Sequence, residues 1–92
     1  MLARNWRCEL GEIDLIVHRP GMLVFAEVKA RADDRFGPAA AAVGHVKQRT
    51  IRRVAARWLA STEHDRGIGH LELRFDVVAV TGVHVEVIEG AF

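Results

Sequence analysis

The pattern of hydrophobic and polar residues predicts a β-hairpin early in the chain. Ile13, Leu15 and Val17 occupy every second position, the period of two that is typical of a strand. Residues 19–21, Arg-Pro-Gly, supply the backbone angles of a turn, and residues 23–29, rich in Val and Phe, favour a return strand. The chain is therefore predicted to form a hairpin here, after a weaker strand near its start, at residues 2 to 7.

Residues 45–61 show a helical pattern instead. Steps of 100° along this segment place hydrophobic side chains on one arc and arginines on the opposite arc. The first arc holds Ile51, Val54, Ala55 and Trp58, and the second holds Arg49, Arg52, Arg53 and Arg57. Residues 74–80 and 83–88 then predict two further strands, so the chain is expected to be a mixed α/β protein.

Two of the predicted strands are hydrophobic on both sides. In residues 23–29 and 74–80, hydrophobic side chains occupy both odd and even positions. Strands of this kind need cover on both faces of the sheet, usually from helices. Because only residues 45–61 predict a long helix, we expect a covering element to be missing or to be supplied by a partner.

Length and composition narrow the class of protein. A chain of 92 residues, 50% hydrophobic and 27% charged, is typical of one folded domain, residues 1–92. The net charge of +1 gives no argument for a particular partner. No hydrophobic run reaches the roughly 18 residues of a membrane helix, and no signal peptide is visible, so a cytoplasmic protein without a membrane partner is expected. Cys8 is the only cysteine, which excludes an intramolecular disulfide and a cysteine-based zinc site.

The main candidate for chemistry is the tripeptide Glu27-Val28-Lys29. The spacing of two puts Glu27 and Lys29 on one face of a hydrophobic strand, where an isolated charge would be costly to bury. The preceding strand carries Glu12 and Asp14 at the same spacing, and the hairpin brings these acids within reach. Three carboxylates and one ammonium group are therefore predicted to gather at one end of the hairpin.

Two interpretations of this cluster remain open. Carboxylates held together repel one another unless a cation lies between them, and hard oxygen ligands favour Mg²⁺ or Mn²⁺. An ion bound by Asp14 and Glu27, with Glu12 as a further candidate ligand, would activate water for phosphodiester hydrolysis. Lys29 would then orient that water or stabilise the developing negative charge. The alternative is a structural salt bridge of Lys29 with Glu27 or Asp14.

Six segments of the chain, in the same order, are similar to a known family. They are LARNWR at 2–7, GEIDLI at 11–16, VFAEVKAR at 24–31, KQR at 47–49, RFDVV at 74–78 and IEGAF at 88–92. Together they resemble the bacterial YraN family of uncharacterised proteins, which in turn resembles Holliday-junction resolvases and the PD-(D/E)-x-K nucleases. The resemblance implies a restriction-endonuclease-like fold, a mixed β-sheet flanked by helices.

The resemblance also implies roles for particular residues. Asp14, Glu27 and Lys29 fall on the two acids and the lysine of the nuclease motif and would be its catalytic residues. The main-chain carbonyl of Val28 would join Asp14 and Glu27 as a metal ligand. Gln48 falls where resolvase-like relatives often carry an active-site glutamine.

The chain departs from such relatives at its beginning. They usually begin with a helix bearing a glutamate that helps to complete the metal site, whereas this chain begins at the first strand. A restriction-endonuclease-like fold without that helix agrees with the expectation of an uncovered sheet face. Resolvase-like relatives also suggest a homodimer.

The middle of the chain is strongly basic, because residues 35–62 contain lysine and several arginines and no acid. The candidate nucleic-acid-binding residues are Lys47, Gln48, Arg49, Arg52 and Arg53. An arginine-rich helix face suits contacts to phosphates, although a solvated face opposite the core is the more common reason for one basic helix. Lys47 lies on the same arc as Ile51 and Trp58, so it is expected to face the acidic cluster.

These observations favour a magnesium- or manganese-dependent endonuclease that acts on DNA, including branched DNA, without excluding RNA. The alternative is a non-catalytic nucleic-acid-binding module that uses the basic helix 45–61 and in which the acidic cluster is structural. The binding module predicts that binding to nucleic acid survives the loss of Glu27, whereas the endonuclease needs Glu27 for cleavage.

Overall fold

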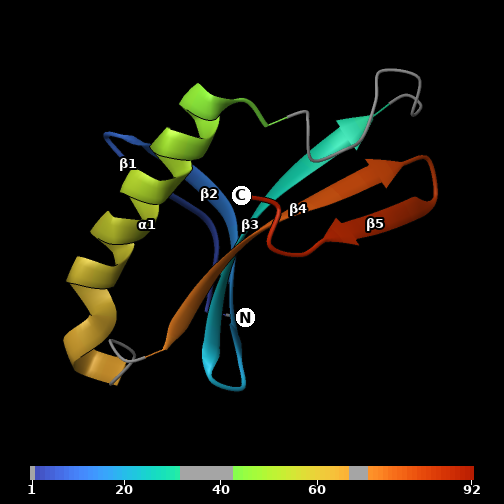
Figure 1. Cartoon of the computed structure of the whole chain (residues 1–92). Coiled ribbons are helices and arrows are strands. Elements are labelled where there is room, and N and C mark those ends of the chain that lie inside the picture. Colours follow the sequence, from blue (N-terminus) through green and yellow to red (C-terminus); the bar gives the residue numbers. More distant parts are fainter. Residues whose placement is uncertain (1, 32–42, 67–70) are drawn as a thin grey trace.

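The computed structural model describes residues 2–31, 43–66 and 71–92. In chain order its elements are β1 (Ala3–Cys8), β2 (Gly11–Arg19), β3 (Met22–Arg31), α1 (His45–Arg66), β4 (Glu72–Thr81) and β5 (His84–Ile88), drawn in Figure 1. Each predicted strand is present, and the predicted helix is present and longer than expected.

The strands form one mixed sheet in the order β1-β2-β3-β4-β5. Neighbouring strands are antiparallel except β3 and β4, which are parallel. A parallel pair needs a crossover connection, and α1 lies in that connection, across one face of the sheet (Figure 1). The prediction of a mixed α/β protein is confirmed, and the arrangement is consistent with a restriction-endonuclease-like fold.

The core lies between α1 and the sheet. The predicted hydrophobic arc of the helix, which includes Val54 and Trp58, is buried there. From the sheet, Phe25 packs edge-on against Trp58 with ring centroids 6.0 Å apart and stacks on Phe75 at 5.3 Å. Burial of such aromatic side chains dominates the energy of a small core, so this contact fixes α1 over β3 and β4.

The helix also approaches β2 closely at Gly11. A Cβ atom at this position would lie 3.0 Å from Cγ2 of Thr50 and 3.5 Å from Cγ2 of Val54. Gly11 also has a φ of 150°, which a residue with a side chain rarely adopts. Glycine is therefore required for β2 to pass under the helix.

The alternation predicted for residues 13–18 is wrong at one point. Ile13 and Ile16 are both buried in the core with α1, although strict alternation places them on opposite faces. The pairing of β1 with β2 skips Asn5 and Asp14, and Asn5 has a positive φ of 54°. The ladder is therefore interrupted at Asp14, which matters for the site described below.

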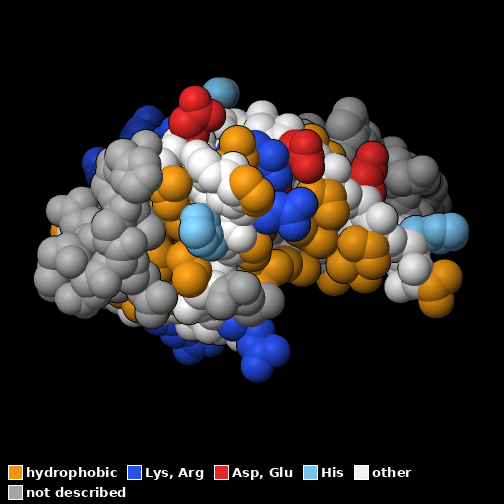
Figure 2. Space-filling model, turned by 90° about the horizontal axis from the view of Figure 1, so that it is seen from below, with side chains coloured by type: hydrophobic (Ala, Val, Ile, Leu, Met, Phe, Trp, Pro, Cys, Tyr) orange, Lys and Arg blue, Asp and Glu red, His pale blue; other side chains and the backbone are white. Residues whose placement is uncertain are grey.

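The face of the sheet opposite α1 is open in the part of the chain that the structure describes. A shallow cavity of about 270 Å³ lies on this face, lined by Leu15, Val17, Arg19, Val24, Ala26, Arg74, Asp76, Val78, Val87 and Glu89. Figure 2 shows hydrophobic side chains among charged ones on the surface seen from below. The expectation that one face lacks cover from this chain is confirmed for the described residues. No described helix is both long and hydrophobic enough to cross a membrane.

Candidate metal centre

Asp14 lies where β2 separates from β3. The register of this pair reaches Leu15 opposite Ala26 and does not continue to Asp14. Instead, the main-chain N–H of Val28 donates a hydrogen bond to Oδ2 of Asp14 at 2.8 Å. The carboxylate therefore takes the place that the main chain of a neighbouring strand would fill, and it is held beside the tripeptide of β3.

Glu27 lies on the face of β3 that α1 covers. Its side chain is buried, and its one ion pair among the described residues joins Oε2 to Nζ of Lys47 at 3.3 Å. Burial raises the pKa of Glu27 above its ordinary value, and the neighbouring Asp14 raises it further through hydrogen bonding and charge. Lys47 offsets only part of this effect, so the ionised form of Glu27 lacks compensating positive charge.

The other two residues of the motif, Val28 and Lys29, also lie beside Asp14 and Glu27. Since the N–H of Val28 points towards Asp14, its carbonyl points to the same side of β3. Lys29 shares the face of Glu27 and is only partly exposed, and no described side chain forms an ion pair with it. The alternative interpretation, a salt bridge of Lys29 with Glu27 or Asp14, is not found among the described residues.

Glu12 does not join the cluster, contrary to the prediction. Its Oε2 accepts a hydrogen bond from Nε of Arg7 on β1 at 2.7 Å. Among the described residues no group of three or more metal-ligating side chains comes together. The structure therefore gathers Asp14 and Glu27, and a role for Glu12 as a further ligand is not supported.

The predicted nucleic-acid-binding residues of α1, together with Arg57, fall into two classes. Lys47 faces the cluster as predicted, Gln48 donates from Nε2 to the carbonyl of Val43 at 2.8 Å, and Arg57 forms an ion pair with Glu9. The guanidinium group of Arg52 lies over the rings of Phe75 and Phe92, 4.8 and 5.8 Å from their centroids. These four side chains have structural partners, which the sequence pattern did not reveal.

Arg49 and Arg53 form the second class. Both are exposed, and no ion pair to either occurs among the described side chains. Of the five residues predicted to bind nucleic acid, these two are the ones that the structure leaves available on the outer face of α1. Lys47 is available only by leaving Glu27.

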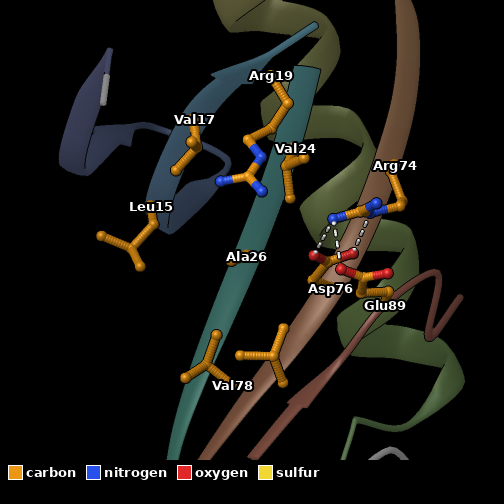
Figure 3. A pocket seen from close by; sticks show the side chains of 10 residues that line it. Leu15, Val17, Arg19, Val24, Ala26, Arg74, Asp76, Val78 and Glu89 are labelled. Atoms are coloured by element: carbon orange, nitrogen blue, oxygen red, sulfur yellow. Dashed lines mark hydrogen bonds and ion pairs between the residues drawn. The ribbon is translucent and has the colours of Figure 1, made fainter. Parts of the chain in front are cut away.

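A second buried acid, Asp76 on β4, was not singled out from the sequence. Its carboxylate accepts hydrogen bonds from Nε and Nη2 of Arg74 at 2.9 and 3.0 Å and from the N–H of Gly90 at 3.0 Å. Arg74 also forms an ion pair with Glu89, with Nη2 3.4 Å from Oε2. Figure 3 shows the three side chains together. The signal was present, because Arg74 and Asp76 are charged residues two positions apart on a strand that is hydrophobic on both sides.

The donor set at Asp14 and Glu27 fits a small hard cation. Mg²⁺ is usually bound by one or two carboxylates and keeps several waters or takes substrate oxygens for its remaining positions. Two carboxylates and the carbonyl of Val28 supply oxygen ligands of this kind. Burial and then the neighbouring Asp14 raise the pKa of Glu27, so a cation beside both carboxylates would stabilise their ionised forms.

Comparison with known proteins identifies the family. Residues 1–80 match the family described as "Uncharacterised protein family UPF0102". The chain belongs to the UPF0102 family. It is 50% identical to a UPF0102 protein of Frankia casuarinae, over 100% of this chain and 79% of the relative. A UPF0102 protein of Saccharophagus degradans is 45% identical over 99% of this chain and 75% of the relative.

A third relative has a lower identity to the chain. A UPF0102 protein of Nitrosomonas europaea is 40% identical over 100% of this chain and 76% of the relative. The resemblance to the YraN family inferred from the six sequence segments is thus confirmed at the level of the family. Because the UPF0102 family is uncharacterised, its chemistry has to be argued from the site itself.

Proposed function

We propose that this UPF0102 protein is a cytoplasmic endonuclease that hydrolyses phosphodiester bonds of DNA with Mg²⁺ or Mn²⁺. One observation carries the proposal: Asp14 and buried Glu27 meet beside the main chain of Val28, at the point where β2 leaves β3. Two acids without sufficient positive charge between them are costly unless a cation is bound.

Each residue of the cluster has a proposed task. Asp14, Glu27 and the carbonyl of Val28 would hold the ion, which when bound would lower the pKa of a water and neutralise charge on the phosphate. Lys29, on the same face as Glu27, would orient the attacking water or stabilise the negative charge that develops on the phosphate. Asp14 is kept in position by its hydrogen bond to the N–H of Val28.

Contacts to the nucleic acid are proposed for a smaller set than the sequence suggested. Arg49 and Arg53 project from the exposed side of α1 and would bind phosphates without reading sequence. Lys47 would contribute once a cation replaces it beside Glu27. Gln48 and Arg52 would act indirectly, because the first holds the start of α1 and the second packs against aromatic rings.

The proposal is tested by cleavage assays on branched, single-stranded and duplex DNA and on RNA. The wild-type protein should cut DNA only when Mg²⁺ or Mn²⁺ is present, and Asp14→Asn or Glu27→Gln should lower the rate at least about a thousandfold. Glu12→Gln is the matched control, since Glu12 pairs with Arg7 away from the cluster, and it should keep its activity. Equal cleavage by wild type and Glu27→Gln would falsify the assignment.

A second candidate is a module that binds nucleic acid without cutting it. The exposed Arg49 and Arg53 favour it, because they need no metal site to contact phosphates. This function predicts salt-sensitive DNA binding that is unchanged in Glu27→Gln and is reduced in a variant with both arginines replaced by Gln. Binding without any metal-dependent cleavage in the wild-type protein would favour this candidate over the nuclease.

A further inference from the structure

β5 forms one edge of the described sheet, with β4 as its only strand neighbour there (Figure 1). An edge strand presents main-chain N–H and C=O groups on which a further strand can pair. Hydrophobic side chains accompany this edge, because Val83, Val85 and Val87 are 93%, 63% and 53% exposed. Exposed hydrophobic groups of this extent at a sheet edge mark an interaction site.

The opposite edge of the sheet, β1, is different. It carries exposed Arg4 and Arg7, and at Asn5 the backbone has a φ of 54° that interrupts regular pairing. Charged side chains and local irregularities are features that discourage the addition of another strand. β5 has a regular ladder to β4 from Val77 opposite Ile88 to Thr81 opposite His84, so it is the edge suited to pairing.

The order of side chains along β5 indicates the partner. We propose that β5 pairs with β5 of a second copy of this chain, antiparallel, around a two-fold axis at Val85. In this register Val85 meets Val85, and His84 of each copy lies opposite Glu86 of the other. An imidazole N–H can donate a hydrogen bond to a carboxylate directly across an antiparallel pair, and valine side chains meet valine side chains on the other face of the strand.

Other registers of the same pairing are disfavoured. A shift by two in one direction puts Glu86 opposite Glu86, and in the other direction it puts His84 opposite His84. The first shift sets two like charges against each other, the second separates each histidine from the carboxylate of the other copy, and an odd shift would bring unlike faces together. The edge is therefore self-complementary in one register, and this inference does not depend on the proposed nuclease function.

Sedimentation of the full chain over a range of concentrations tests the pairing. The wild type should be in equilibrium between monomer and dimer, and Val85→Lys should raise the dissociation constant about tenfold or more. Val46→Lys is the matched control, because Val46 is an exposed valine on α1, and it should leave the equilibrium unchanged. A monomer up to millimolar concentration, or a dimer equally stable in Val85→Lys, overturns the proposal.

Exchange of the side chains at positions 84 and 86 tests the register. His84→Glu alone should weaken the dimer because it places two carboxylates opposite each other, and Glu86→Lys alone should weaken it because it removes the carboxylate that faces the histidine. The double variant places opposite charges across the pair and should recover wild-type affinity. Failure of the double variant to recover, with circular dichroism showing all three folded, overturns the register.

Crosslinking gives an independent measurement. In a Cys8→Ala background, Val85→Cys should form an intermolecular disulfide, because the two-fold axis brings this position against itself. Val83→Cys should not, since its counterpart in the second copy is Val87. Crosslinking of Val83→Cys in preference to Val85→Cys contradicts the proposed register.

Discussion

The sheet buries two carboxylates, Glu27 on β3 and Asp76 on β4, and their surroundings differ. Asp76 is 3% exposed and accepts hydrogen bonds from two guanidinium nitrogens of Arg74 and from the N–H of Gly90. Glu27 is 6% exposed and has one ion pair among the described residues, to the half-exposed Lys47. A second acid, Asp14, lies beside Glu27 and raises its pKa.

This difference separates a structural acid from a candidate functional one. A buried carboxylate whose oxygens are satisfied by donors of the protein has little to gain from a ligand. A buried carboxylate beside another acid has an unmet need for positive charge, which is typical of metal and catalytic sites. Both carboxylates are buried, so burial does not tell the structural acid from the candidate functional one. Their hydrogen-bond and ion-pair partners do.

The largest expected effect concerns Asp76. Asp76→Ala removes the acceptor of the Gly90 N–H and the main acceptor of Arg74, which keeps only Glu89, so we expect the free energy of unfolding to fall by about 3 kcal/mol. For a domain of this size the melting temperature should fall by roughly 15 °C in thermal denaturation. Glu72→Ala, at an exposed position of the same strand, is the control and should change it little. If Asp76→Ala lowered the free energy of unfolding only slightly, Asp76 would not be the structural acid that its hydrogen bonds indicate.

A smaller effect of opposite sign is expected at Glu27. Glu27→Gln keeps the shape of the side chain and removes a buried charge that Asp14 repels, so the metal-free protein should become about 1 kcal/mol more stable. Chemical denaturation in the presence of a chelator at pH 7 measures this change. Asp76→Asn should lose stability under the same conditions, and a parallel loss in Glu27→Gln would show that Glu27 is structural as well.

The smallest effect is expected at Lys47, whose ammonium group competes with a cation for Glu27. Lys47→Met should tighten Mn²⁺ binding several-fold, roughly 1 kcal/mol, when measured at pH 8 by calorimetry. Arg53→Met, on the same helix but without an ion pair to either acid among the described residues, should change the affinity less. Weaker Mn²⁺ binding in Lys47→Met would show that the lysine supports the site and does not compete for it.

Much of the fold could be predicted because its signals are local. The turn at Pro20-Gly21, the period of two in β3 and the helical arcs of α1 each depend on neighbouring residues, and all are present. The two-sided hydrophobic pattern of β3 and β4 also predicted the face that the described residues leave uncovered. The break in alternation at Asp14 was missed, because it depends on where β2 leaves β3 and on Gly11 passing under the helix.

Part of the candidate site could also be predicted, because it depends on residues close together in the sequence. Asp14 and Glu27 meet because a hairpin joins their strands, and this follows from sequence alone. Glu12 was misplaced because its partner Arg7 lies on β1, whose pairing register is not visible in a weak strand pattern. The ring contacts of Arg52 join residues far apart in the chain, so a helical arc could not reveal them.

Titration of the purified chain with Mn²⁺, followed by electron paramagnetic resonance, tests the central claim most directly, because it needs neither substrate nor activity. The wild-type protein should bind Mn²⁺ in competition with Mg²⁺, and Asp14→Asn and Glu27→Gln should each weaken binding at least about a hundredfold. Glu12→Gln and Asp76→Asn should bind as the wild type does, provided that both remain folded. Mn²⁺ binding that is equally strong in Glu27→Gln and wild type would contradict a metal centre at Asp14 and Glu27.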